Sequence, residues 1–410
     1  MNHIFLNKHE QNKYVNLIEL NKLGKNIYRK VEHIIMNITV VGAGNMGLAI
    51  TGFLAIHNDS KVILFTGKKI LEKGILQVND VEEKSVKSTK NFICTEDPNT
   101  AFEHADVILV TYPAFLRKKF INSYGEYMKD DSFLGFVPGY GGAEYFCTNL
   151  IQRGITIFGL QRVPYVARAT LNENGYQAGI LSKKTKLYIC AIPKDKTEEI
   201  SSVIGELLEI PVQPLKEYLA ITLAPSNPLL HITGLYNVFK NYNKGDIFEH
   251  QLKFYEEWND ETSKLLFAYD KELQSICTAL YPLDMSEVVS LPIYYESLTS
   301  EDMTRKLKSI ESFKAVMVPL IKNNDVYAID LKSRMFEEDY PYGVCVIKDF
   351  AIMTGVQTPV IDLLLKFYEK ISGHKYFDEN DKYVEEICNT GVPGIAGLSS
   401  IQELIRFYHR

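Results

Sequence analysis

A glycine-rich turn near the start of the chain has the spacing of a phosphate-binding loop. In ITVVGAGNMGLAI, residues 38–50, three glycines form a G-x-G-x-x-G pattern between an apolar run and a helical stretch. The free N–H groups and positive dipole end of such a helix favour a pyrophosphate. A glycine-rich turn in an unrelated α/β protein is the alternative. We predict that a dinucleotide contacts Gly42, Gly44, Asn45, Met46 and Gly47.

The residues after the second predicted strand bear on which dinucleotide binds. The stretch VILFTGKK, residues 62–69, lacks the Asp or Glu that NAD sites often place there for the ribose 2′-hydroxyl. Thr66, Lys68 and Lys69 could instead hold a 2′-phosphate, because a hydroxyl and two cations suit a dianion. We therefore favour NADP over NAD as the cofactor. The alternative is that both lysines are ordinary surface residues, which leaves NAD open.

A second glycine-rich turn follows a later apolar run. The stretch FVPGYGGAEYF, residues 136–146, contains Gly139, Gly141 and Gly142. Ligands of open parallel sheets bind outside the carboxyl ends of the strands. We expect this turn to border the nicotinamide and Gly141 to contact the cofactor, although a role in packing alone is the alternative.

Two stretches in the second half of the chain contain candidates for acid–base chemistry. His231 lies in APSNPLLHITGLYNVF, residues 224–239, on an otherwise apolar helix, whereas most other histidines have polar or charged neighbours. Taken alone, such a histidine is more often a core residue than a catalytic one. The stretch SRMFEEDYPYG, residues 333–343, contains Arg334, Glu338 and Asp339 before an apolar helix. Its composition is equally compatible with a solvated loop.

The elements that position these residues follow a recognisable order. From Asn37, short apolar runs alternate with helical stretches, which predicts βαβ units and a doubly wound parallel sheet with helices on both faces. A basic patch of Arg117, Lys118 and Lys119 is expected on one of the helices. Residues 175–193 predict a hairpin that extends the sheet. The strands are expected at residues 37–43, 62–67, 92–97, 105–112, 132–139 and 155–161.

Strand patterns become rare after about residue 215. Stretches such as residues 247–280 and 301–323 show helical spacing. We predict a dinucleotide-binding domain over residues 36–210 and a mostly α-helical domain over residues 211–410. Residues 1–35 contain no chemical motif, and they are either a small extra helix or leader, or precede a true start at Met36.

Composition limits the classes of function. The net charge of −6 does not favour nucleic acid or an anionic membrane surface, and the apolar runs are too short to span a bilayer. The six cysteines form no CxxC pair and have no histidine at zinc-ligand spacing, so we expect no metal site and isolated thiols in a reducing, cytoplasmic compartment. Small-molecule substrates are the expected partners, and a homodimer is a further possibility.

Several of these stretches together resemble one family, the octopine/nopaline (opine) dehydrogenases. The resemblance rests on VVGAGNMG, VPGYGGAE, GLQRVPYVAR, NPLLH, R-x-x-x-E-D-x-P-Y-G and G-V-x-T-P, which occur in this order between about residues 36 and 365. The NP…H and ED-x-PYG elements are the most specific. The resemblance implies a Rossmann domain followed by an α-helical substrate domain, with the active site between them.

The family reduces the imine formed between an α-keto acid and the amino group of an amino acid, using NAD(P)H. By resemblance, His231 is the catalytic acid/base, Asp339 its partner, and Arg334 the residue that binds a substrate carboxylate. Glu338 is expected to be a neighbour without a catalytic role. The sequence contains no motif that identifies the amino acid or the keto acid.

Two other functions remain as alternatives. Simple keto-acid reductases of the ketopantoate reductase type share this architecture, but they use a lysine as the catalytic cation. A cofactor-binding sensor without catalysis would be expected to have lost at least one of His231, Arg334 and Asp339. The presence of all three residues favours the opine reaction over both alternatives.

Overall fold

The computed structural model describes residues 35–70, 72, 75–173 and 175–410. Residues 36–410 form one compact unit. The two interpretations of the leader concern residues that, apart from Ile35, lie outside the described ones. Below, residues 36–214 are called the N-terminal lobe and residues 215–410 the helical lobe.

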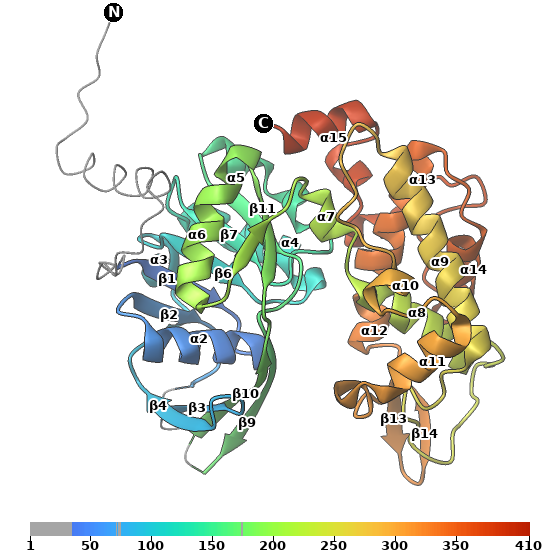
Figure 1. Cartoon of the computed structure of the whole chain (residues 1–410), viewed down its shortest axis with the longest axis horizontal. Helices are drawn as coiled ribbons and strands as arrows, with labels where there is room; N and C mark the ends of the chain where they lie inside the picture. The colour runs from blue at the N-terminus through green and yellow to red at the C-terminus, as the bar shows by residue number, and fades with distance from the viewer. Residues whose placement is uncertain (1–34, 71, 73–74, 174) are drawn as a thin grey trace, which may run out of the picture. The chain divides into compact units, whose positions relative to one another are not determined.

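The N-terminal lobe is built on an eight-stranded sheet with the order β12-β11-β8-β7-β6-β1-β2-β5. Figure 1 labels β1, β2, β6, β7 and β11 of this sheet. Its strands run parallel, except that β8 and β11 are antiparallel to each other. The predicted doubly wound sheet is therefore confirmed. The strands are β1 (Asn37–Val41), β2 (Lys61–Phe65), β5 (Ile93–Thr95), β6 (Val107–Val110), β7 (Phe133–Phe136), β8 (Thr156–Leu160), β11 (Leu187–Ile192) and β12 (Val212–Pro214).

Both faces of this sheet are buried, as expected for a parallel sheet. In β2, Ile63 and Phe65 belong to one apolar cluster, whereas Val62 and Leu64 belong to the other. The first cluster continues into the helical lobe. The sheet is accompanied by α2 (Asn45–His57), α3 (Pro98–Phe102), α4 (Ala114–Tyr124), α5 (Thr148–Gln152) and α6 (Thr197–Leu208).

A second, four-stranded sheet was not predicted. Its order is β4-β3-β10-β9, formed by β3 (Leu76–Asp80), β4 (Ser85–Thr89), β9 (Tyr165–Asn172) and β10 (Gly175–Lys183). The predicted hairpin over residues 175–193 is wrong, because β10 pairs with β9 and β3, whereas β11 joins the main sheet beside β8. The two apolar runs look like one hairpin, but β10 forms its hairpin with β9, the strand before it, and β11 pairs with β8 in the main sheet.

The helical lobe contains the predicted helices and one small hairpin, β13 (Leu320–Asn323) with β14 (Val326–Ile329). The helical spacing predicted two stretches, residues 247–280 and 301–323, that are longer than the helices observed there. Residues 247–259 precede α9 rather than belong to it, and residues 310–323 end in β13. The principal elements are α7 (Leu219–Thr222), α8 (Ser226–Phe239), α9 (Asp260–Ala279), α10 (Leu291–Tyr294), α11 (Ser300–Ser309), α12 (Arg334–Glu337), the π-helical turn η7 (Tyr340–Val344), α13 (Cys345–Thr354), α14 (Pro359–Ser372) and α15 (Ile401–Tyr408).

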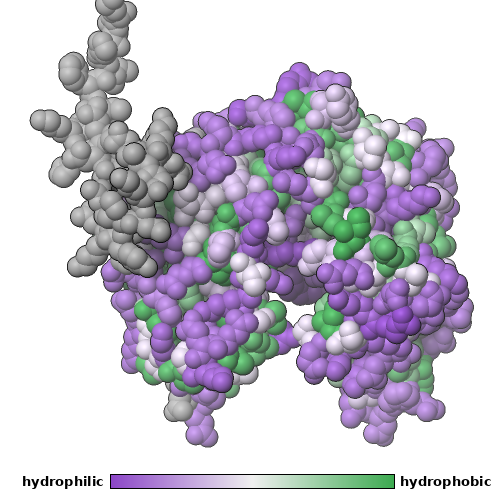
Figure 2. All heavy atoms as spheres, in the orientation of Figure 1, coloured by the Kyte–Doolittle hydropathy of each residue, from purple (hydrophilic) through white to green (hydrophobic). Residues whose placement is uncertain are grey.

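The visible face of the described residues is mostly hydrophilic, with hydrophobic side chains in scattered groups (Figure 2). Among the described residues, no helix combines the length and apolar character needed to cross a membrane.

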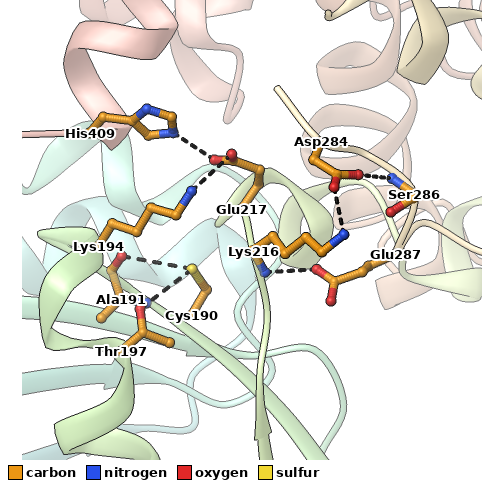
Figure 3. A network of polar contacts seen from close by, with 10 residues as sticks. All are labelled: Cys190, Ala191, Lys194, Thr197, Lys216, Glu217, Asp284, Ser286, Glu287 and His409. Carbon is orange, nitrogen blue, oxygen red and sulfur yellow. Dashed lines mark hydrogen bonds and ion pairs between the residues drawn. The ribbon is translucent and has the colours of Figure 1, made fainter. Parts of the chain in front are cut away.

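A polar network surrounds the start of the helical lobe. The main sheet continues through Pro214, beyond the boundary predicted at residue 210. Just after it, buried Glu217 accepts a hydrogen bond of 3.0 Å from Lys194 Nζ and lies 2.8 Å from His409 Nε2 (Figure 3). Glu217 thus connects the segment after the sheet to both the N-terminal lobe and the C-terminal end of the chain.

Candidate active site

The first glycine-rich turn has the backbone geometry of a phosphate loop. Gly42 has a φ of +101°, and a Cβ on Gly47 would lie 1.7 Å from the Gly42 carbonyl oxygen. A Cβ on Gly44 would meet nothing within 4 Å, so the turn is open there. Helix α2 begins at Asn45 without a side-chain cap, which leaves its first N–H groups available. These features fit a dinucleotide pyrophosphate.

The side chains of Asn45 and Met46, which follow Gly44, make contacts within the protein. Asn45 Oδ1 accepts a hydrogen bond of 2.9 Å from the Ala169 backbone N–H, and Met46 packs against an apolar cluster. The predicted contact of Asn45 and Met46 with the cofactor would therefore be made by their backbone N–H groups.

The two lysines after β2 differ in their surroundings. Lys68 Nζ donates a hydrogen bond of 3.1 Å to the Ala43 carbonyl, within the glycine-rich turn, and its backbone N–H contacts Thr66 Oγ1 at 3.2 Å. Lys69 instead lies 3.3 Å from Glu72 and is largely exposed. Lys68 and Thr66 are thus beside the phosphate loop, whereas Lys69 points to an acidic neighbour.

An acidic side chain that sequence analysis missed lies beside the same turn. A Cβ on Gly67 would be 3.4 Å from Glu96 Oε2. Because β5 pairs in parallel with β2, with Phe65 opposite Thr95, Glu96 follows β5 at the edge where Thr66 follows β2. The signal in the sequence was the strand predicted at residues 92–97, which ends in TED. Only the register of β5 on β2 brings Glu96 to this position.

The second glycine-rich turn packs against the helical lobe. Gly141, at a φ of +98°, would place a Cβ 2.7 Å from Ala114 Cβ, and Gly142 would place one 1.9 Å from the Gly391 carbonyl oxygen. The structure therefore accounts for both glycines by close packing. Contact between Gly141 and the cofactor stays a prediction.

The predicted acid–base pair is brought together by α8 and η7. His231 Nδ1 lies 2.7 Å from Asp339 Oδ2, and the two side chains are 18% and 5% exposed. The close approach of the two elements requires a glycine, since a Cβ on Gly343 would lie 2.6 Å from Pro228 Cβ. The NP and PYG residues of the two motifs are therefore in contact.

The charge state of this pair depends on its surroundings. Burial raises the pKa of the Asp339 carboxyl above its ordinary value, and the adjacent His231 acts in the opposite direction. The hydrogen bond occupies Nδ1 of the imidazole, so Nε2 is the ring nitrogen that this bond leaves available. Phe254 packs edge-on against the ring at 5.9 Å between centroids.

Arg334 lies close by but is held by an acidic residue. Its Nε donates a hydrogen bond of 2.8 Å to Glu338 Oε2, which also accepts from Nη2. The other oxygen of the buried Glu338 accepts a hydrogen bond of 2.8 Å from the backbone N–H of Ala114, the first residue of α4. Glu338, which was expected to be a neighbour without a catalytic role, orients Arg334 and links it to the N-terminal lobe. The arginine itself remains 66% exposed.

The predicted basic patch on α4 is wrong for one residue. Arg117 is 1% exposed, and its guanidinium donates hydrogen bonds to the carbonyls of Tyr112 and Tyr140. Arg117 is buried because its side chain faces the sheet and the second glycine-rich turn. It fixes the backbone of that turn instead of presenting charge to a ligand.

Known proteins resemble the chain in both lobes. The model of the NAD/NADP octopine/nopaline dehydrogenase α-helical domain matches residues 214–372, and the ketopantoate reductase PanE/ApbA model matches residues 38–189. The octopine dehydrogenases of Mizuhopecten yessoensis and Pecten maximus are each 23% identical, over 90% of this chain and 98% of theirs. The tauropine dehydrogenase of Arabella iricolor is 21% identical, over 90% of this chain and 99% of its own.

Solved structures agree on the fold. Octopine dehydrogenase with NADH and L-arginine superposes with a TM-score of 0.79 at 21% identity, covering 92% of this chain and 98% of that one. A 2-dehydropantoate 2-reductase from Geobacter metallireducens reaches 0.55 at 13% identity, covering 82% and 99%. The reductases thus share the architecture. The match to the octopine/nopaline dehydrogenase helical domain and the full-length relatives distinguish this chain from the reductases. Together, the family model over the helical lobe and the full-length similarity to curated octopine dehydrogenases support the opine dehydrogenase family, whose members are oxidoreductases that act on CH–NH groups.

Proposed function

We propose that the protein catalyses the NAD(P)H-dependent reductive condensation of an α-keto acid with the amino group of an amino acid. The observation that carries the proposal is the 2.7 Å contact between His231 Nδ1 and Asp339 Oδ2. Relatives named octopine, tauropine and opine dehydrogenases support the reaction class.

The acid–base work falls to His231. Condensation expels the keto oxygen as water, so a proton must reach that oxygen while the amine loses protons. With Nδ1 held by Asp339, the imidazole presents Nε2 to donate and accept these protons. The Asp339 carboxylate stabilises the imidazolium while Nε2 is protonated, and it keeps the ring in one orientation. The reduced nicotinamide, when bound, supplies the hydride that reduces the C=N carbon.

Arg334 is suited to bind a carboxylate of the keto acid. Its pairing with Glu338 uses Nε and Nη2, and its Nη1 remains for a substrate. Because Glu338 is buried and also bonded to Ala114, the guanidinium is held in one orientation instead of sampling many. Preorganisation of this kind lowers the entropic cost of substrate binding.

NADPH is the cofactor that we favour. Lys68 lies beside the phosphate loop and Thr66 is its neighbour, which suits a 2′-phosphate, with Lys69 as a secondary cation. Glu96 is the opposing observation, because a carboxylate at this edge would suit a ribose 2′-hydroxyl. The preference therefore depends on whether Lys68 or Glu96 contacts the ribose.

The test is oxidation of NADPH and of NADH by the purified full chain. Pyruvate or another keto acid is combined with each of the twenty amino acids, and each component is omitted in turn. We expect oxidation only when keto acid and amine are both present, faster with NADPH. Oxidation with keto acid alone would instead assign the protein to the simple keto-acid reductases.

A further inference from the structure

A tyrosine in the second glycine-rich turn has a hydroxyl group that the fold does not use. Tyr140 is 5% exposed, and its ring centre lies 5.8 Å from the guanidinium carbon of Arg117. None of the described residues forms a hydrogen bond with its hydroxyl. Unlike the unpaired hydroxyls of Tyr269 and Tyr340, this oxygen is not sealed from solvent. The small exposed part of Tyr140 therefore includes its hydroxyl.

Close packing fixes the backbone on both sides of Tyr140. A Cβ on Gly139 would lie 2.6 Å from a side-chain carbon of α7, and a Cβ on Gly141 would lie 2.7 Å from Ala114 Cβ. The carbonyl of Tyr140 itself accepts a hydrogen bond from the buried guanidinium of Arg117. The side chain of Tyr140 thus starts from a backbone position that has little freedom to move.

The same turn borders the residues that hold Arg334. Ala114, which packs against Gly141, donates its backbone N–H to Glu338 Oε1 at 2.8 Å. The other carboxylate oxygen of Glu338 accepts a hydrogen bond of 2.8 Å from Arg334 Nε. A short chain of direct contacts therefore leads from the residue after Tyr140 to the guanidinium that is suited to bind a substrate carboxylate.

The charged groups around Tyr140 are those of the candidate site. Burial raises the pKa of its phenol well above the ordinary value, and the carboxylates of Glu338 and Asp339 act in the same direction. The guanidinium groups of Arg117 and Arg334 act in the opposite direction on this pKa. The hydroxyl therefore stays protonated and can donate a hydrogen bond to an anion.

Of the two arginines near Tyr140, Arg334 is the one that a ligand can reach. Arg117 is 1% exposed and is bonded to backbone carbonyls, whereas the Arg334 side chain is 66% exposed. A carboxylate has two oxygens and more lone pairs than one guanidinium N–H satisfies. Glu338 and Asp339 would repel such a carboxylate, so a neutral donor beside Arg334 favours its binding.

We propose that the Tyr140 hydroxyl donates a hydrogen bond to the carboxylate of the keto acid, beside Arg334. The inference rests on the proposed reductive condensation and assigns a second donor to the substrate that Arg334 binds. Tyr140 is thus a substrate-binding residue, and proton transfer stays with His231. Because this carboxylate keeps its charge throughout the reaction, the hydrogen bond contributes to substrate binding more than to kcat.

Tyr140→Phe removes the hydroxyl and keeps the ring against Arg117. We expect KM for the keto acid to rise about 10- to 100-fold, with a change in kcat of less than about threefold. Oxamate tests binding without turnover, because it contains the –CO–COO⁻ unit of every α-keto acid but has no ketone to condense. Calorimetry with the NADPH complex should show that the Kd for oxamate rises by a factor similar to the rise in KM.

Tyr269→Phe is the matched control. The Tyr269 hydroxyl is also unpaired and lies in the field of Asp339, but it is sealed from solvent. This substitution should leave KM and Kd unchanged, and the melting temperature and NADPH affinity of both variants are measured to exclude misfolding. Unchanged KM and Kd in Tyr140→Phe, or equal changes in Tyr269→Phe, would overturn the inference. A fall in kcat alone would also overturn it, because the hydroxyl would then act at the reacting carbon instead of the carboxylate.

A failure of the proposed reaction would look different, because no combination of keto acid and amine would then oxidise NADPH. In that case the oxamate titration still decides the inference. Binding that is weakened in Tyr140→Phe but not in Tyr269→Phe supports it, and absence of binding by the wild-type NADPH complex refutes it.

Discussion

His231 and Asp339 form a contact of 2.7 Å between Nδ1 and Oδ2, although 108 positions separate them in the chain. Helix α8 carries the first residue, and the second immediately precedes η7. The contact exists because Gly343 allows its turn to approach Pro228 of α8. The chemistry of the pair and the packing of these two elements are therefore linked.

Replacement of Asp339 by Asn is expected to lower kcat by about 10²- to 10⁴-fold. The amide keeps the shape but no longer stabilises an imidazolium, and it can hold the ring with the wrong nitrogen protonated. Steady-state kinetics with the identified substrates check the effect, and NADPH affinity measured by fluorescence should be unchanged. A kcat close to that of the wild type would remove the basis for assigning acid–base work to His231.

Gly343→Ala should damage both stability and activity. A Cβ at this position would lie 2.6 Å from two side-chain carbons of Pro228, so the backbones must separate, at a cost of about 1–3 kcal/mol in the free energy of unfolding. Urea denaturation measures this cost. Gly205→Ala is the matched control, because Gly205 lies within α6, where alanine is favoured, and its Cβ would meet only ordinary contacts, the nearest being the Ile210 carbonyl oxygen at 3.6 Å. Equal effects of the two substitutions would contradict this account of the contact.

Glu338→Gln should affect mainly substrate binding, whereas Glu338→Ala should also lower stability. Glutamine can still accept the hydrogen bond from the Ala114 N–H but loses the charge that orients Arg334, so KM for the keto acid should rise about tenfold with a smaller change in kcat. Alanine also leaves a buried N–H unpaired, which should lower the free energy of unfolding by about 1–3 kcal/mol. Glu337→Gln, at an exposed neighbouring position, is the control for both measurements. A KM unaffected by either change would show that Glu338 does not position Arg334.

Lys68→Glu should affect the two cofactors unequally. If Lys68 contacts a 2′-phosphate, the substitution raises KM for NADPH at least about tenfold and leaves KM for NADH nearly unchanged. Lys69→Glu should have a smaller effect because Lys69 lies beside Glu72. Glu96→Gln provides the converse test, since a rise in KM for NADH alone would place Glu96 on the ribose. Equal losses for both cofactors in Lys68→Glu would refute the proposed 2′-phosphate contact.

Glu144 should make stability depend on pH. Burial raises its pKa from the ordinary value of 4.5 to about 7, although Thr222 Oγ1 donates a hydrogen bond of 2.7 Å to it. Between these values the folded protein keeps a proton that the unfolded chain has lost. The stabilisation is therefore complete below pH 4.5 and is lost as the pH rises to about 7.

Glu144→Gln removes this titration. The free energy of unfolding of the wild type should fall relative to that of the variant by up to about 1.4 kcal/mol per pH unit across this range. Urea denaturation of both proteins at pH 5, 6, 7 and 8 gives the comparison. A difference between them that does not change with pH would show that Glu144 is ionised throughout.

Local patterns determined much of this protein. The apolar run before Gly42 and the helix after it follow from spacing that a single segment contains, and β2, β6, β7 and β8 are predicted for the same reason. His231, Arg334 and Asp339 could also be proposed as site residues from the sequence, because the order and composition of the motifs resemble one family.

The tertiary structure decided what depends on long-range pairing and burial. The pairing of β10 with β3, and of β11 with β8, depends on strands distant in sequence. Arg117 looks like a surface cation until the sheet covers it, and Glu96 reaches Gly67 only through the register of β5 on β2. Glu338 gains its role from an N–H group of the other lobe. Side-chain type and local spacing specify which residues can do chemistry, but neighbours that are far apart in the chain are defined only by the folded packing.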